Sequence, residues 1–491
     1  MERSSGILMH ISSLPSPYGI GSFGKEAYEF IDFLSIAGQK YWQILPIGST
    51  GYGDSPYQSF STFAGNPFFI DLQLLKEEDL LEARDFDNID FGDNPTKVDY
   101  SKIFENKLPV LRKAFENGKI RYGDEVEAFK KENVLWVEDY GLYMALKFHF
   151  NSKSWQEWEQ DIKLREQEAI HYYKERLKDE IDYWIFLQFL FFIQWNRLKN
   201  YANDKGIKII GDIPIYVAED SVDAWVNSEI FLFDEYNRPI HVAGCPPDGF
   251  SETGQLWGNP LYRWDVLEER GFDWWVERIS GSMRLYDVIR VDHFRGLESY
   301  WAVPYGEQTA EGGNWLKGPG IKLFHAIEAQ LGHVEIIAED LGFLTPDVIA
   351  LREQTKYPGM KVLQFAFNIW EESDYLPHNY DKDCVVYTGT HDNDTVMGWL
   401  QNGPRDDVAF AKRYLHLNEE EGVHWGFIRG AWSSVGDLAI AQLQDFLGLG
   451  SEARMNTPST LEGNWHWRVK KEALTRELAE KIGGLTKLYG R

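Results

Sequence analysis

Charged side chains interrupt an otherwise apolar segment, Asp287-Val288-Ile289-Arg290-Val291-Asp292-His293-Phe294-Arg295. The apolar residues predict a buried strand, in which side chains two residues apart point to the same side, so Arg290 and Asp292 are expected to be neighbours. Burying two charges costs free energy unless they are paired and hydrogen-bonded. The pair is therefore either a structural ion pair at a strand end or part of a reactive site, and the rest of the chain decides between the two.

Carboxylates end three further apolar segments, at Asp212, Glu339 and Asp392. Cleavage of a glycosidic bond with retention needs a nucleophilic and a protonatable carboxyl group about 5–5.5 Å apart. Arg290 would keep Asp292 ionised for the first role. The apolar run before Glu339 would favour its protonated form, which suits a general acid. Asp392, directly after His391, is placed to accept hydrogen bonds from sugar hydroxyls.

Metal binding is the rival chemistry, because carboxylates and histidines also hold Mg²⁺ or Zn²⁺. The HExxH spacing of zinc enzymes and the DxDxDG spacing of calcium loops are not found in the sequence. A phosphate site is not predicted, since no glycine-rich loop opens a helix after an apolar strand. Any single carboxylate of the set can still have a structural role.

Eight apolar segments with the length of strands alternate with helical segments, for example at 25–37, 346–355 and 393–400. The strand segments are 6–11, 41–46, 207–214, 287–295, 334–340, 361–366, 384–392 and 438–443. This alternation predicts an α/β fold, a (β/α)₈ TIM barrel. The third, fourth, fifth and seventh segments end in the carboxylates, and active sites of such barrels lie at the carboxyl ends of the strands.

Two insertions are predicted between the strands. Residues from about 72 to 175 are dense in charge and show helical periodicity, which indicates a helical subdomain, ended by a long helix over 180–203. Residues from about 216 to 264 are loop-rich. The stretch after the eighth strand is too short for a C-terminal β-sandwich domain. We therefore expect a single catalytic barrel domain over residues 1–491.

Composition narrows the partners and the compartment. A formal charge of −27 argues against nucleic acid and anionic membranes as partners, and aromatic residues at 15% suit the binding of sugar rings. Cys245 and Cys384 show no CxxC or zinc spacing, and the N-terminus lacks a signal-peptide pattern. The longest apolar run, 183–195, is too short to span a bilayer. These features predict a cytoplasmic protein.

The chain resembles glycoside hydrolase family 77, the 4-α-glucanotransferase (amylomaltase) branch of the α-amylase clan. The resemblance covers nearly the whole chain. Its motifs are HISSLP at 10–15, GDSPYQ at 53–58, GDIP at 211–214, RVDHFRG at 290–296, AEDLG at 338–342, THDN at 390–393 and NWHWR at 464–468. The first two and the last are specific to this family, and the others have counterparts in the wider clan.

This resemblance implies a role for each matching residue. Asp292 matches the nucleophile that forms a covalent β-glucosyl intermediate, Glu339 the general acid/base, and Asp392 the residue that stabilises the transition state. Arg290 and His391 match the neighbours that orient the nucleophile and the bound glucose. The family uses no metal and no organic cofactor, so none is expected here.

Substrate-binding residues are implied in the same way. Tyr57 matches an aromatic residue that stacks near the cleaved sugar. Asp212 matches an acidic residue of the clan, either in substrate contact or in a structural role. Residues 244–260 match a lid loop, on which Phe250 and Trp257 would stack on the glucan. A passive surface loop would have the same glycine and proline content.

The predicted function is transfer of an α-1,4-glucan segment to the 4-hydroxyl of another glucan or of glucose, with retention by two displacements. The partners are then α-1,4-glucans and maltooligosaccharides, and a monomer is favoured. An α-1,4-glucan hydrolase would use the same carboxylates, although the lid favours transfer. A glucan-binding protein without catalysis is the third hypothesis. One departure from the family pattern is Asn368, where an acidic residue is expected.

Overall fold

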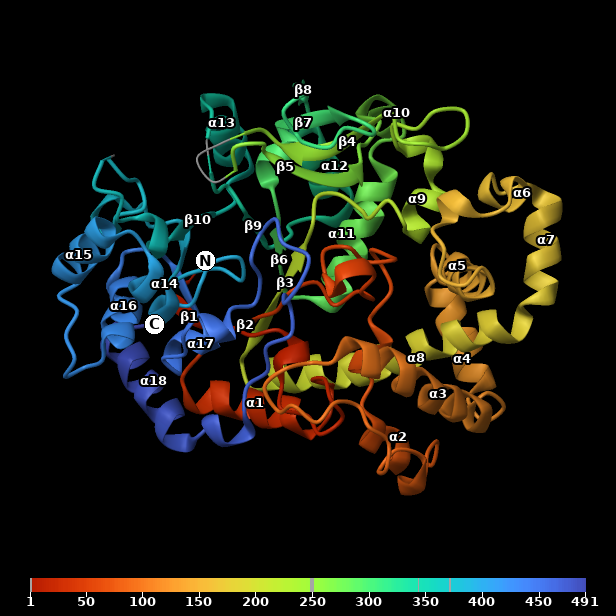
Figure 1. Ribbon diagram of the computed structural model, residues 1–491, viewed down its shortest axis with the longest axis horizontal. Coiled ribbons are helices and arrows are strands. Elements are labelled where there is room, and N and C mark those ends of the chain that lie inside the picture. The colour runs from red at the N-terminus through yellow and green to blue at the C-terminus, as the bar shows by residue number, and fades with distance from the viewer. Residues whose placement is uncertain (1, 248–250, 343, 371) are drawn as a thin grey trace.

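The structure, a computed structural model, describes residues 2–247, 251–342, 344–370 and 372–491. Its main sheet, within these residues, contains eight parallel strands in the order β10-β11-β12-β1-β2-β3-β6-β9 (Figure 1). The strands are β1 (Ser4–Leu8), β2 (Tyr41–Gln43), β3 (Lys208–Ile213), β6 (Val288–Val291), β9 (Ile336–Ala338), β10 (Gly359–Val362), β11 (Cys384–Tyr387) and β12 (Leu438–Gln442). The N–H of Ala338 donates to the carbonyl of Pro358 (3.0 Å), which joins β9 to the start of β10. The predicted (β/α)₈ barrel is confirmed.

The strands end earlier than the apolar segments that predicted them. The segment 384–392 gives a strand only over Cys384–Tyr387, and 361–366 gives Gly359–Val362 followed by a single 3-10 turn. The barrel strands are buried on both faces, so they are mostly apolar and show no regular alternation of polar residues. Apolar character continues into the loops beyond the strands because these loops are buried as well, so it does not mark where the ladder stops.

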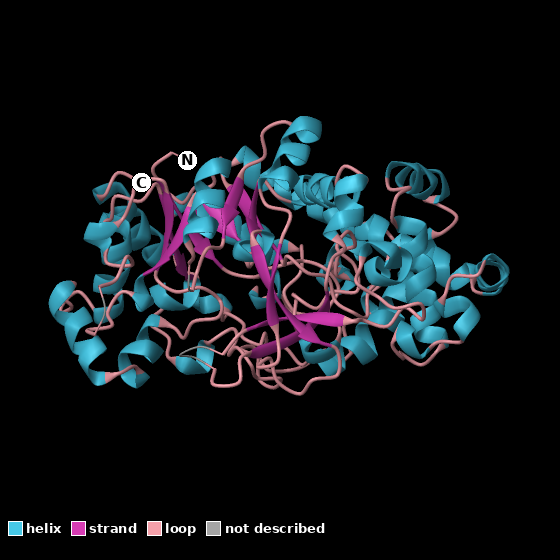
Figure 2. Cartoon of the chain, turned by 90° about the horizontal axis from the view of Figure 1, so that it is seen from above, coloured by secondary structure: helices cyan, strands magenta, loops and turns pink. Residues whose placement is uncertain are grey.

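Helices surround the barrel and connect its strands (Figures 1 and 2). They include α1 (Lys25–Ile36), α8 (Lys178–Asp204), α11 (Asp273–Leu285), α12 (Ile321–Leu331), α13 (Pro346–Thr355), α14 (Val396–Asn402), α15 (Arg405–Tyr414), α16 (Val423–Ser433) and α18 (Arg476–Leu488). The start of α13 shows why the sequence located it: Thr345 accepts a hydrogen bond from the N–H of Val348 (3.4 Å), and Pro346 occupies the first turn. Over the described parts of the chain, every helix is too short or too polar to cross a bilayer.

The chain between β2 and β3 contains a group of helices beside the barrel, on the right of Figure 1. They are α2 (Leu72–Glu77), α3 (Tyr100–Gly118), α4 (Gly123–Glu132), α5 (Val137–His149), α6 (Gln160–Lys163) and α7 (Gln167–Arg176). Helix α5 packs along α8, and the buried Lys147 of α5 forms an ion pair with Asp220, which follows β3. This contact connects the helical stretch to a loop at the carboxyl end of the barrel.

A second, antiparallel sheet lies next to the barrel and has the strand order β5-β4-β7-β8 (Figure 2). Its strands are β4 (His241–Cys245), β5 (Gln255–Pro260), β7 (Ser299–Pro304) and β8 (Asn314–Lys317). The sequence analysis predicted a loop-rich stretch over 216–264 and did not identify the regular elements inside it, which are β4, β5 and the short helix α9 (Val222–Val226); the helix α10 (Trp264–Glu269) begins at its end. The two strands depend on β7 from beyond β6, and no local pattern reveals such a distant partner.

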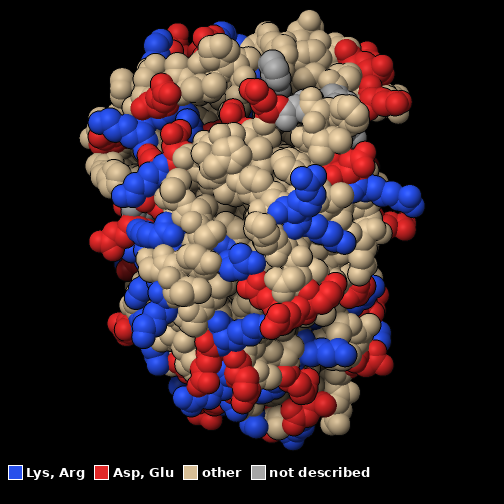
Figure 3. Space-filling model, turned by 90° about the vertical axis from the view of Figure 1, so that its left-hand side faces the viewer, with Lys and Arg blue, Asp and Glu red and all other residues tan. Residues whose placement is uncertain are grey.

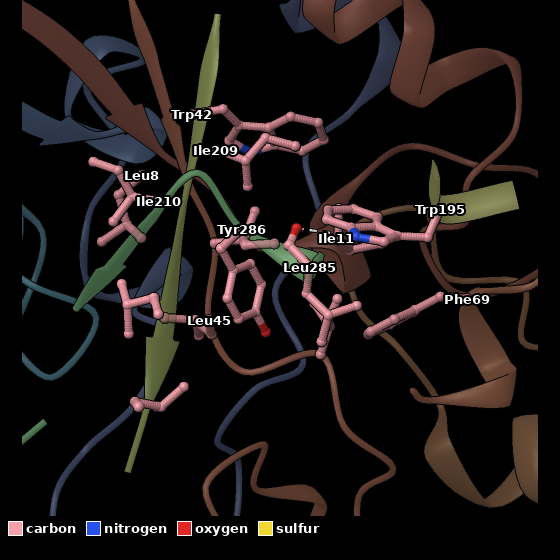
Figure 4. Close-up of a cluster of buried hydrophobic side chains, with 14 of the residues drawn as sticks. Leu8, Ile11, Trp42, Leu45, Phe69, Trp195, Ile209, Ile210, Leu285 and Tyr286 are labelled. Carbon is pink, nitrogen blue, oxygen red and sulfur yellow. Dashed lines mark hydrogen bonds between the residues drawn. The ribbon is translucent and has the colours of Figure 1, made fainter. Parts of the chain in front are cut away.

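The barrel and the helices share one continuous hydrophobic core, part of which is drawn in Figure 4. Trp195 of α8 is fully buried there (0% exposed) and packs against Phe23 with ring centroids 5.2 Å apart. Its indole N–H donates to the carbonyl of Leu285 at the end of α11 (3.1 Å). Trp195 therefore connects α8 with the end of α11 and with the loop that precedes α1.

We predict that Trp195→Ala lowers the free energy of unfolding by about 3–5 kcal/mol, because it leaves a cavity and an unpaired carbonyl. Urea-induced unfolding followed by circular dichroism measures the loss. Trp370 is 83% exposed and provides the matched control. Trp370→Ala is expected to change the free energy of unfolding by less than about 0.5 kcal/mol. Equal effects of the two substitutions would contradict this account of the core.

Candidate active site

A buried ion-pair chain lies at the carboxyl ends of β3 and β6. The guanidinium of Arg290 is 3% exposed, and its Nη1 donates to Asp292 Oδ1 (2.9 Å) and to Asp212 Oδ1 and Oδ2 (2.8 and 2.6 Å). The predicted proximity of Arg290 and Asp292 is thus confirmed. Burial raises the pKa of Asp212, and the charge of Arg290 acts in the opposite direction. Asp212 and Asp292 therefore share one cation.

Glu339 lies one residue beyond β9, and its carboxyl group accepts two backbone hydrogen bonds. Oε2 accepts from the N–H of His293 (2.7 Å) and Oε1 from the N–H of Leu341 (2.9 Å). Burial, followed by the negative charge of Asp292, raises the pKa of Glu339 to about 7. At neutral pH this side chain is therefore partly protonated, as the apolar run before it predicted.

His293 turns the chain sharply after β6. Its backbone has a φ of 53°, in the left-handed region, and this places its N–H against Glu339. Burial lowers the pKa of the imidazole to about 4, so the ring is neutral near pH 7. The indole of Trp257, on β5, meets this ring edge-on with centroids 4.8 Å apart. The β4–β5 hairpin therefore reaches the strand end that carries Asp292.

Asp392 lies beyond β11, and its side chain is 44% exposed. Its Oδ1 accepts a hydrogen bond from Asn456 Nδ2 (2.6 Å) and lies 3.4 Å from His391 Nε2. Its backbone carbonyl accepts from Arg454 Nη2 (2.6 Å). The carboxylate is thus held from the side of the C-terminal segment, with an exposed part left for other contacts.

Tyr57, on the loop after β2, connects the ion-pair chain at Asp212 with the His391–Asp392 segment. Its hydroxyl donates to Asp212 Oδ2 (2.9 Å) and lies 3.4 Å from His391 Nδ1. The Tyr57 and His391 rings stack with centroids 5.1 Å apart, and Trp465 lies 5.8 Å from Tyr57 and 5.9 Å from His391. The burial of Tyr57 raises its pKa well above the ordinary value, so the hydroxyl stays protonated.

The contacts bring eight of the predicted residues into one site: Tyr57, Asp212, Arg290, Asp292, Glu339, His391, Asp392 and, through His293, Trp257. Phe250 lies outside the described residues. Asn368 lies beyond β10, and its Oδ1 accepts a hydrogen bond from the N–H of Trp370 (3.0 Å). Across the described ranges, no three or more His, Cys, Asp or Glu side chains are grouped so that they could hold a metal ion.

Sequence reasoning did not identify Arg454 and Asn456 as part of the site. They lie on irregular backbone, and their contacts with Asp392 follow no periodic pattern that a single sequence displays. Trp465 was named only as part of the family motif at 464–468, and no other feature of the sequence indicated this segment. The role of His293 as a backbone donor depends on its left-handed φ, which the residue type does not predict.

A partly protonated carboxyl group beside an arginine-bound carboxylate, at the mouth of a (β/α)₈ barrel, defines an enzyme class that acts on glycosidic bonds. The family model described as 4-alpha-glucanotransferase matches residues 9–475. The chain belongs to this family.

Known proteins of the family are similar over the full length of the chain. A 4-alpha-glucanotransferase of Clostridium butyricum is 57% identical over 485 residues, which are 98% of this chain and 100% of that protein. One of Streptococcus pneumoniae is 51% identical and covers 100% of this chain and 98% of its own. The structure of amylomaltase from Streptococcus agalactiae in complex with acarbose has a TM-score of 0.98 at 44% identity and covers 100% of both chains.

We predict that the stability of the native protein relative to Glu339→Gln falls as the pH rises from about 4.5, the ordinary value, to about 7. A carboxyl group with a raised pKa keeps its proton in the folded state over this range while the unfolded chain loses it, so folding becomes less favourable. The amide adds a constant cost, because it places a donor opposite a backbone N–H. Thermal unfolding at a series of pH values measures the difference, and a constant difference would contradict the raised pKa.

Proposed function

We propose that Asp292 and Glu339 carry out a double displacement on α-1,4-glucans. The protein has the 4-alpha-glucanotransferase activity of its family, and the observation that supports the residue roles is the raised pKa of Glu339 beside the arginine-bound Asp292. Asp292 attacks the anomeric carbon, and the bond to the leaving oxygen breaks as Glu339 gives that oxygen its proton. Ionised Glu339 then removes a proton from the 4-hydroxyl of the acceptor, whose oxygen displaces Asp292.

The remaining residues hold the sugar and the nucleophile. Asp392 accepts hydrogen bonds from hydroxyls of the distorted ring through its exposed part, and His391 supports it. Arg290 orients Asp292. Tyr57 presents an aromatic surface next to His391. Asp212 is 0% exposed and bonded to Arg290 and Tyr57, which supports a positioning role and not substrate contact.

Transfer in place of hydrolysis requires that water is kept from the covalent intermediate. Trp257 on the β4–β5 hairpin contacts the ring of His293, next to Asp292. The predicted lid at 244–260, which contains β5 and the end of β4, is therefore proposed to cover the acceptor side of the site. An α-1,4-glucan hydrolase is the alternative if it does not.

The remaining features of the proposal concern the whole chain. We propose a single catalytic barrel domain with insertions at about 72–175 and 216–264, a monomeric state and a cytoplasmic location. On the face drawn in Figure 3, basic side chains are interspersed with acidic ones and form no continuous basic patch. This mixture, with the net charge of −27, supports neutral glucans as partners in place of nucleic acid.

Incubation with maltotriose tests the function directly. We expect glucose and a ladder of longer maltooligosaccharides with no rise in total reducing ends, because each cleaved bond is replaced by a new one. Asp292→Asn is expected to abolish the ladder. Asp347→Asn, at a residue whose side chain is 70% exposed on α13, is the matched control and leaves the ladder unchanged. Maltose and glucose with rising reducing ends would identify a hydrolase.

The pH dependence tests the assignment of Glu339. The acid acts in its protonated form, so kcat/KM for maltotriose is expected to fall as the pH rises through about 7. Glu339→Gln is expected to lower kcat by about 10²–10⁴-fold, since it removes the proton donor. Initial rates of glucose release at a series of pH values measure both effects. A value of kcat/KM that stays constant well above pH 7 would contradict the assignment.

A further inference from the structure

Residues 388–395, between β11 and α14, form a segment without regular secondary structure. It carries His391 and Asp392. Within it, Asn393 Oδ1 accepts hydrogen bonds from the backbone N–H of Thr390 (2.8 Å) and from its hydroxyl (3.0 Å). These bonds shape the turn itself. They do not explain how the turn keeps its position relative to the barrel.

One buried carboxyl group contacts both ends of this segment. Asp445 lies on the short helix α17 (Leu443–Phe446), directly after β12, and is fully buried (0% exposed). Its Oδ2 accepts a hydrogen bond from the hydroxyl of Thr388 (2.6 Å), where the segment begins. Its Oδ1 accepts from the N–H of Val396 (2.7 Å), directly after the segment ends. A single side chain, from the short helix that follows the neighbouring strand β12, therefore spans the segment.

Placing a carboxyl group here costs free energy. Burial raises the pKa of Asp445 to about 7, against the effect of its two hydrogen bonds, and the neighbouring charge of Asp394 has the same sign. An apolar side chain of similar size would avoid this cost but would leave the hydroxyl of Thr388 and the N–H of Val396 without their acceptor. What Asp445 supplies is the geometry of two acceptors.

We propose that Asp445 is a positioning residue of the transfer reaction, and that its two hydrogen bonds hold residues 388–395 where Asp392 faces the sugar. This inference rests on the proposed function, in which Asp392 stabilises the transition state. The support is separate from that of Asn456, which bonds to the Asp392 carboxylate itself. Asp445 contacts the two ends of the segment, whereas Arg454 and Asn456 contact its middle, at the backbone carbonyl and the carboxylate of Asp392.

Paired variants of Thr388 provide the sharpest test. Thr388→Val keeps the shape and removes the hydroxyl, whereas Thr388→Ser keeps the hydroxyl. We expect Thr388→Val to lower kcat for maltotriose about ten- to hundredfold with KM changed less than about twofold, since displacement by about 1 Å has effects of this size. Thr388→Ser is expected to stay close to the native kcat. Asp445→Asn is expected to lower kcat similarly, and the double variant no further.

Thr486→Val is the matched control, because this threonine is also buried (2% exposed) and its hydroxyl accepts hydrogen bonds from Gln39 and Trp432 on another side of the fold. It is expected to keep the native kcat. Circular dichroism at the assay temperature verifies that each variant is folded. If Thr388→Val does not fold, the comparison of Asp445→Asn with Thr388→Ser carries the test.

Three results would overturn the inference: a native kcat in Thr388→Val and Asp445→Asn, an effect on KM alone, or equal losses in Thr388→Ser and Thr388→Val. Asp392→Asn separates this failure from a failure of the proposed function. If Asp392→Asn is inactive while the Thr388 and Asp445 variants are native, only the positioning role is wrong. If Asp392→Asn keeps its activity, the role proposed for Asp392 in the transfer reaction is wrong.

Discussion

The site depends on one buried cation, Arg290, which is 3% exposed inside the mouth of the barrel. It donates hydrogen bonds to two carboxyl groups, those of Asp212 and Asp292. Asp212 is fully buried. Burial and the charge of Asp292 raise the pKa of Glu339, and Arg290 acts in the opposite direction, so the raised pKa that suits the proposed acid arises despite the cation.

A polar layer inside the barrel keeps Arg290 in place. Its Nε donates to the sulfur of Met360 on β10 (3.4 Å), so the guanidinium touches three strands. Beside it, the hydroxyl of Tyr387 on β11 donates to Gln43 Oε1 on β2 (2.8 Å). The interior of such a barrel is filled by side chains and resists small displacements. The position of the charge is therefore determined by packing across the barrel as much as by the ion pairs.

The sequence predicted those parts of the fold and the site that follow from local sequence patterns, and not those that depend on contacts between distant segments. Arg290, Asp292 and Glu339 were predictable because a buried parallel strand produces an apolar run, and a charge directly after that run stands out. The pairing of β4 with β7 was not, because it joins segments on either side of β6. Arg454 and Asn456 act through single hydrogen bonds from irregular backbone, and such bonds leave no periodic pattern.

A segment near each end of the chain, 10–15 and 464–468, lies next to the site. The site is therefore built from residues that are far apart in the sequence. β1 pairs with β12, the N–H of Val469 donates to the carbonyl of Ser13 (2.9 Å), and Arg468 donates to the carbonyl of Leu14 (3.1 Å). The motifs at 10–15 and 464–468 are therefore one structural unit, and this unit places Trp465 beside Tyr57. Contacts between such distant segments form slowly, because the loop they close is long. The strand ends position Arg290, Asp292 and Glu339, but the aromatic cluster of Tyr57, His391 and Trp465 is complete only when residues 10–15 and 464–468 have folded together.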